Sequence, residues 1–62
     1  MEPLFSLNQI VRGRFAGTFV VINRTIEHGE FQYHLKEVHP VTFDQPQPGG
    51  LRLPESALRA VA

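Results

Sequence analysis

The feature that most constrains this fold is the segment over residues 18–38, TFVVINRTIEHGEFQYHLKEV, which predicts two strands joined by a tight turn. In its second arm Phe31, Tyr33 and Leu35 alternate with polar residues, so one face is apolar and the other faces water. The first arm, residues 18–26, is rich in β-branched residues, which favour a strand over a helix. An isolated hairpin is marginally stable in water, so the rest of the chain is expected to cover the apolar face.

The turn of this hairpin is expected at residues 27–29, EHG. Gly29 suits the left-handed position of a three-residue loop with a bulge. The second strand loses its alternation near its end, because Val38 falls on the same face as the polar Lys36. A β-bulge near Glu37, or the end of the strand there, would explain this change of phase.

The chain has 62 residues and no cysteine, which predicts one small domain over residues 1–62 without disulfides. A domain of this size buries only about 60% of its unfolded surface, so its core is thin. Its stability is therefore expected to come from good packing or from association with another subunit. Five Phe and one Tyr favour a packed core over disorder.

The N-terminal half adds an arm and a short strand to the hairpin. Residues 1–8 form the arm, and Phe5 is expected to lie over an open end of the core rather than to anchor a partner. Residues 9–14 predict a strand that ends at Gly13 and enters the hairpin through a loop closed by Gly17.

The C-terminal half predicts a loop and two short strands. The segment DQPQPGG, residues 44–50, has two Pro, two Gly and no periodicity, which indicates an exposed loop. A strand is expected over residues 51–53, one helical turn over 54–58 with Pro at its first position, and a last strand over 59–61. A single helix over residues 54–62 is the alternative.

This order of elements predicts an all-β fold, a five-stranded SH3-like barrel with a short helical turn before the last strand. Within the first arm of the hairpin, the inward pair Phe19 and Val21 could exchange with Val20 and Ile22. The predicted core consists of Ile10, Phe15, Phe19, Val21, Phe31, Tyr33, Leu35, Leu53, Leu58 and Val61.

Two resemblances accompany these patterns. The run IVRGRFAGTFVVI, residues 10–22, resembles the KOW motif of translation-type SH3 barrels. The resemblance extends over residues 9–38 and rests mainly on Gly17 and the β-branched strand that follows it. It implies a first hairpin of the strand–glycine–strand type, and partners such as RNA, ribosomal proteins or polymerases.

The second resemblance covers more of the chain. The glycine turn, the His-Pro pair and the final LPESALRAV are similar to the plasmid-borne type II dihydrofolate reductases, SH3-like barrels that form a tetramer around one active pore. The active segment of that family reads Val-Gln-Ile-Tyr, where this chain has Leu51, Arg52 and Leu53. Because the pore glutamine and tyrosine are absent, the resemblance implies a shared fold rather than a shared activity.

Six basic and six acidic residues give a net charge of zero. Neutrality argues against a protein that depends entirely on phosphate backbones, where a strong positive field supplies much of the affinity. The charges are unevenly placed, however, because residues 1–25 hold Arg12, Arg14 and Arg24 against Glu2 alone. The sequence therefore allows a local basic face but not a global one.

We expect a non-catalytic interaction module that binds a protein partner or its own copies. A KOW-like RNA- or DNA-binding protein and an oligomeric reductase-like enzyme are the alternatives. The candidate binding residues are basic or polar side chains on predicted strands: Arg12, Arg14, Arg24, Gln32, His34, Lys36 and Arg52.

No motif predicts an enzyme, a cofactor or a metal. His28, His34 and His39 lack a spacing that implies convergence on zinc, and no nucleophile motif surrounds Ser6 or Ser56. Neither a signal peptide nor a membrane-spanning apolar run is visible. These features predict a small cytoplasmic protein of bacterial type.

Overall fold

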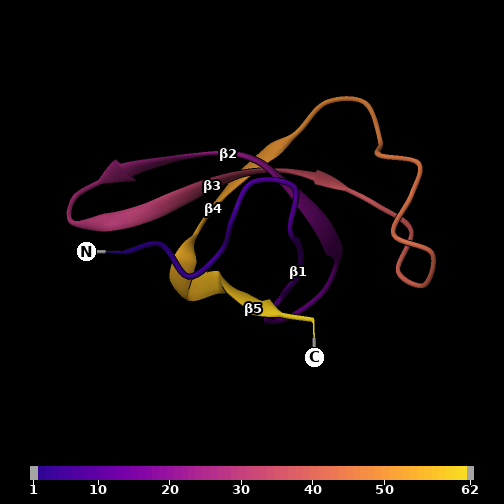
Figure 1. Ribbon diagram of the computed structural model, residues 1–62, viewed down its shortest axis with the longest axis horizontal. Coiled ribbons are helices and arrows are strands. Elements are labelled where there is room, and N and C mark those ends of the chain that lie inside the picture. Colours follow the sequence, from indigo (N-terminus) through magenta and orange to yellow (C-terminus); the bar gives the residue numbers. More distant parts are fainter. Residues whose placement is uncertain (1, 62) are drawn as a thin grey trace.

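The computed structural model describes residues 2–61 as one antiparallel sheet of five strands (Figure 1). The strand order is β4-β3-β2-β1-β5, so the first strand lies between the second and the last. The all-β prediction is confirmed. Pairing among the described residues leaves β4 and β5 as edges and does not close the sheet into a barrel. The elements are β1 (Ile10–Gly13), β2 (Thr18–Glu27), β3 (Glu30–Glu37), β4 (Leu51–Pro54), the 3-10 helix η1 (Glu55–Ala57) and β5 (Leu58–Ala60).

The β2–β3 hairpin turns through two residues, because Glu27 pairs directly with Glu30. His28 and Gly29 both have positive φ, 53° and 77°. Positive φ at both central residues is the requirement of a type I′ turn, whose twist matches that of the flanking strands. The predicted position of Gly29 is confirmed, whereas the predicted three-residue loop is wrong.

A bulge lies in the middle of β2. Val21 pairs with Leu35 and Asn23 with His34, so Ile22 is an extra residue without a cross-strand partner. The predicted bulge near Glu37 is therefore wrong, and the alternative holds, because β3 ends there. An extra residue reverses the alternation of all that follows it, because side chains in a strand have a period of two.

The core lies on the face that the central strands turn toward the N-terminal arm. Six predicted core residues are buried, and Leu53 packs against them while partly exposed. Three predictions are wrong: Ile10 and Val61 are half-buried, and Phe15 is exposed. The buried apolar residues are Phe5, Val11, Phe19, Val21, Phe31, Tyr33, Leu35, Val38 and Leu58.

The register of β1 against β2 explains why Val11, and not the predicted Ile10, is buried in the core. Val11 pairs with Phe19, and directly opposed residues of an antiparallel pair point to the same face. Ile10 pairs with Val20 and so points to the outer face. The assignment of Phe19 to the inner face is confirmed. Because Val11 pairs with Phe19, this assignment also determines which side chains of β1 point inward.

The N-terminal arm covers the open end of the core, as predicted. The ring of Phe5 is 4% exposed and meets that of Tyr33 edge-on, with ring centroids 5.3 Å apart. The Tyr33 hydroxyl donates to Glu55 Oε2 at 2.7 Å, and the same oxygen accepts the Leu4 amide at 3.0 Å. Burial, and then the hydrogen bond to Glu55, raise the pKa of Tyr33 above its ordinary value of 10.0.

The C-terminal segment contains one 3-10 turn followed by a strand, so the predicted turn and strand are confirmed and the single helix is wrong. Residues Leu58–Ala60 are extended because β5 pairs with β1. The Ser56 amide donates to Glu30 Oε1 at 3.1 Å, which fastens η1 to the start of β3. Hydrogen bonds from Ser56 lower the pKa of Glu30.

A long connection separates β3 from β4. All of residues 44–50 are exposed, as predicted for this Pro- and Gly-rich loop. Figure 1 shows the connection projecting beyond the sheet at the end opposite the β2–β3 turn.

Candidate functional site

The loop between β1 and β2 is held by backbone geometry. The Gly13 amide donates to the Gly17 carbonyl at 3.0 Å, and Gly17 has a φ of 95°. A Cβ atom at Gly17 would overlap the ring of Phe19, and one at Gly13 would overlap the carbonyl of Ala16. The loop therefore requires glycine at both ends.

Phe15 projects from this loop into solvent and is 99% exposed. Its prediction as a core residue is wrong because β1 ends at Gly13, and the loop leaves the sheet before Phe15 can turn inward. Phe5, Phe19 and Phe31 are buried. Among the described residues, Phe15 is thus an aromatic ring that is not needed for packing.

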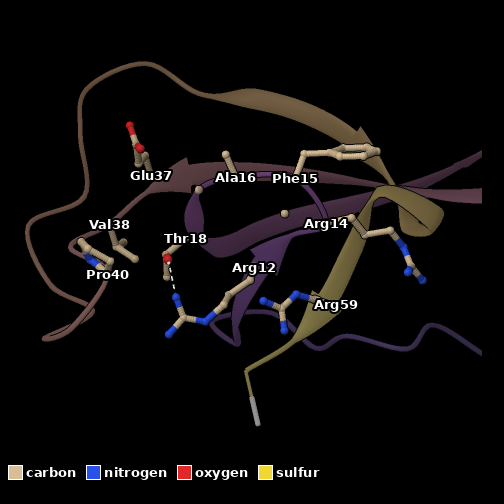
Figure 2. Close-up of a pocket in the computed structure, with 11 residues that line it drawn as sticks. Arg12, Arg14, Phe15, Ala16, Thr18, Glu37, Val38, Pro40 and Arg59 are labelled. Carbon is tan, nitrogen blue, oxygen red and sulfur yellow. Dashed lines mark hydrogen bonds between the residues drawn. The ribbon is translucent and has the colours of Figure 1, made fainter.

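Two arginines face each other beside this loop. Arg12 of β1 and Arg59 of β5 are directly opposed across the strand pair. Arg12 Nη1 donates to Thr18 Oγ1 at 3.1 Å, as the dashed line in Figure 2 marks. Thr18 is itself buried, so this hydrogen bond fixes one side of the guanidinium and leaves its other N–H groups for a ligand.

Arg14 completes the group, which we call the arginine cluster: Arg12, Arg14 and Arg59. The Arg14 amide donates to the Ala57 carbonyl at 2.9 Å, and its Nε donates to the Ser56 carbonyl at 2.6 Å. Both contacts join the loop to η1. The terminal nitrogens of Arg14 make no hydrogen bond within residues 2–61, so its charge is positioned but not neutralised.

A depression of about 390 Å³ lies between the arginine cluster and the loop. Figure 2 shows Phe15 on one side of it and the side chains of Arg12 and Arg59 on the other. Glu37 also lines it, but within the described part of the chain the ion pair that forms joins Arg52 to Glu27, at 3.0 Å. The cluster therefore has no carboxylate partner among these residues.

The predicted binding residues fall in three separate places. Arg12 and Arg14 belong to the cluster. Arg24 pairs with Tyr33 and so points to the inner face, where its Nη1 donates to the Phe5 carbonyl at 3.3 Å. The expectation that Arg24 shares a face with Arg12 and Arg14 is wrong, because the bulge in β2 reverses its direction.

The other predicted residues lie on the outer face of β3 and β4. Gln32, His34 and Lys36 alternate along β3, and His34 is opposite Arg52. Arg52 is occupied by its ion pair with Glu27. By alternation Lys36 shares a face with Arg12, with β2 lying between them.

A small groove lies at the β2 bulge, with a volume of about 240 Å³. Ile22 and Leu51 line it and are 45% and 40% exposed. His34 Nε2 is buried beside them and has no hydrogen-bond partner among the described residues. This groove is apolar and is distinct from the arginine cluster.

Sequence reasoning missed Arg59. It named Phe15 both as a core residue and, with Phe43, as an aromatic candidate for stacking a base. Arg59 was placed on a last strand, but only the pairing of that strand with β1 brings it opposite Arg12. A signal for Phe15 was present: it lies between the two glycines that close the loop.

Within residues 2–61, no three side chains of the His, Cys, Asp or Glu type are grouped as a metal site would require. His39 Nδ1 instead accepts the amides of Val41 and Thr42, at 3.1 and 3.2 Å. In the same residues no helix has the length and hydropathy needed to span a membrane.

Comparison of the chain with protein-family models, with curated proteins and with solved structures found no match.

Proposed function

We propose that the protein is a non-catalytic interaction module whose arginine cluster binds the phosphates of a nucleic acid. The strand order, with β1 between β2 and β5 and a 3-10 turn before the last strand, supports an open SH3-like barrel as the fold. A sheet of this kind supplies a rigid base for side chains that project from its strands and loops.

The observation that carries the proposal is the like-charged pair of Arg12 and Arg59. Equal charges directly opposite on neighbouring strands destabilise a sheet by a few tenths to about 1 kcal/mol. No carboxylate of the described residues pairs with either guanidinium. A bound phosphate would remove the repulsion and accept hydrogen bonds from both arginines, because guanidinium and phosphate geometries match.

The experiment is a titration of fluorescently labelled oligonucleotides at several salt concentrations. Three arginine–phosphate contacts predict that log K falls against log salt concentration with a slope of about −2 for a single strand. Replacing Arg12 and Arg59 by Gln is expected to weaken binding at least about tenfold and to flatten the slope.

The matched control is Arg52→Gln. It removes one positive charge from the same sheet, as each of the two cluster substitutions does, but Arg52 lies on β4 and is paired with Glu27. We expect the affinity to change by less than about twofold, which is a smaller effect than the loss of one phosphate contact would have. Absence of binding at low salt, or an equal loss in both variants, would contradict the proposal.

A stability measurement separates a binding role from a structural one. Arg59→Gln removes the repulsion, so it is expected to raise the free energy of unfolding by up to about 1 kcal/mol while it weakens binding. If Arg59 served only to stabilise the fold, its replacement would instead lower the free energy of unfolding. Urea denaturation followed by circular dichroism provides the measurement.

Association with a protein or with a second copy is the second candidate, and the groove at the β2 bulge favours it. Ile22 and Leu51 offer apolar surface there. His34 Nε2 has no hydrogen-bond partner within residues 2–61, and a docked chain could supply one. Light scattering over a range of concentrations tests self-association. A monomer at every concentration, together with no effect of Leu51→Asp on any captured partner, would exclude this groove as an interface.

A further inference from the structure

The ring of Phe15 is exposed by the construction of its loop, and this exposure has no role in packing. A fully buried Phe contributes about 1.5–3 kcal/mol relative to an exposed one, so the folded chain forgoes that stabilisation at this position. The loop maintains the exposure through the Gly13–Gly17 hydrogen bond of 3.0 Å and the left-handed Gly17. The ring is therefore held away from the core by the backbone and does not lie on a frayed end.

We infer that the arginine cluster takes a single-stranded nucleic acid and that Phe15 stacks on one of its bases. This inference rests on the proposed function and deepens it. The same depression presents two kinds of surface: an aromatic face on the loop and guanidinium groups on β1 and β5 (Figure 2). A nucleotide of a single strand offers the complement of both, a π-face and a phosphate.

Single strands fit this arrangement better than duplexes do. In a duplex the faces of the bases are covered by their neighbours, so a ring at a loop tip could reach only the grooves or the backbone. In a single strand a base can unstack and lie against an exposed aromatic ring, which contributes about 1–3 kcal/mol per base. Phe15 is one ring, so we expect one stacked base for each bound chain.

The arginines are arranged to receive the adjoining phosphates. Arg12 is fixed by Thr18 Oγ1 at 3.1 Å, and Arg14 by the Ser56 carbonyl at 2.6 Å. Each anchor uses one N–H group of its guanidinium, and the other N–H groups make no hydrogen bond within residues 2–61. Glu37 lies across the depression from Arg59 in Figure 2, and its carboxylate disfavours a phosphate on that side. The backbone of the strand is thus expected to run along the arginine side.

The test compares three labelled probes of equal length: a single-stranded oligouridylate, a blunt duplex, and an abasic single strand that retains the phosphates. Phe15→Ala is expected to weaken binding of the oligouridylate by about 5- to 150-fold, the equivalent of one stacked base. Binding of the abasic strand and the duplex should not change. Phe15→Tyr should restore the affinity and Phe15→Leu should not, because only the first has an aromatic face.

A second readout does not depend on affinity. The chain has no tryptophan, so Phe15→Trp introduces a single indole at the tip of the loop. Stacking of a base is expected to quench its fluorescence when oligouridylate is added, whereas the abasic strand should leave the fluorescence unchanged. Equal quenching by both probes would overturn the inference.

The outcomes separate this inference from the proposed function. If oligonucleotides bind with the expected salt slope but Phe15→Ala has no effect, the stacking inference fails and the arginine cluster remains a phosphate site. If no probe binds at low salt, both fail. If Phe15→Ala instead converts a dimer to a monomer in light scattering, the ring is a contact between copies and the inference is overturned. Because Phe15 is 99% exposed, an unchanged circular dichroism spectrum is expected for every variant at this position.

Discussion

Two regions of the molecule, the N-terminal arm and the β1–β2 loop, use phenylalanine in opposite ways. In the arm, Phe5 is 4% exposed and is held by side chains, through the ring of Tyr33 and the carboxylate of Glu55. In the loop, Phe15 is 99% exposed and its position is held by the backbone of two glycines. We therefore expect the arm to depend on side-chain packing for stability, whereas the ring of Phe15 can be replaced without unfolding the protein. That freedom is what a binding surface requires.

The sharpest test of this comparison replaces each ring by alanine. Phe5→Ala is expected to lower the free energy of unfolding by about 3–5 kcal/mol, as large-to-small changes in a core do. Since a chain of 62 residues has a total stability of about 3–9 kcal/mol, this loss removes at least about a third of it. Phe15→Ala should change stability by less than about 0.5 kcal/mol. Urea denaturation measures both, and similar losses would remove the distinction between the two regions.

The backbone control of the loop is tested by Gly17→Ala. An alanine must adopt a left-handed φ of 95° and must displace the ring of Phe19, so we expect a loss of about 2–4 kcal/mol. Gly29→Ala is the matched control, because Gly29 also has positive φ but nothing lies within 4 Å of an added Cβ. Its loss should be limited to about 1–2 kcal/mol. Equal losses would show that close packing does not hold the loop.

The hydroxyl of Tyr33 makes a smaller contribution to holding the arm. Tyr33→Phe keeps the ring but removes the donor to Glu55 and the acceptor of the Phe5 amide, so we expect a loss of about 1–2 kcal/mol. The arm should loosen first, which faster hydrogen exchange of the Leu4 and Phe5 amides would report. An unchanged exchange rate would mean that ring packing alone holds the arm.

The same hydroxyl predicts a dependence of stability on alkaline pH. Its folded pKa lies above the ordinary value of 10.0, so the folded state retains its proton longer than the unfolded state does. This part of the stability is complete below about pH 10 and declines as pH rises toward the folded pKa. Tyr33 is the chain's single tyrosine, so absorbance reports its titration directly. In Tyr33→Phe the tyrosine contribution to this decline should disappear.

The sequence predicted well the features that follow from local alternation. Phe31, Tyr33 and Leu35 are buried as expected, because a half-buried strand shows its faces with a period of two. Phe5 was also predicted correctly, since a thin core leaves an open end that an apolar arm can cover. These predictions depend only on residues that are close to one another along the chain.

The errors occurred where the direction of a side chain depends on one extra residue or on a distant strand. Nothing local marks Ile22 as a bulge, yet it turns Arg24 toward the core and away from the predicted basic face. The hydrophobicity of Phe15 predicted burial, whereas the loop glycines determine where the ring points. Arg59 could not be joined to Arg12 without knowing that β5 pairs with β1.

The pairing of β1 with β5 has a consequence for when the site forms. The β2–β3 hairpin closes through a two-residue turn, and such local closure takes place within microseconds. Joining Val11 to Ala60 must close a loop that contains most of the chain, so it belongs to the slow, non-local part of folding. Arg59 meets Arg12 only at that last step. Arg14 is likewise held only after η1 has reached the loop, so a nascent or partly folded chain would present Phe15 without the assembled arginine cluster. The proposed site is complete only when β5 has paired with β1.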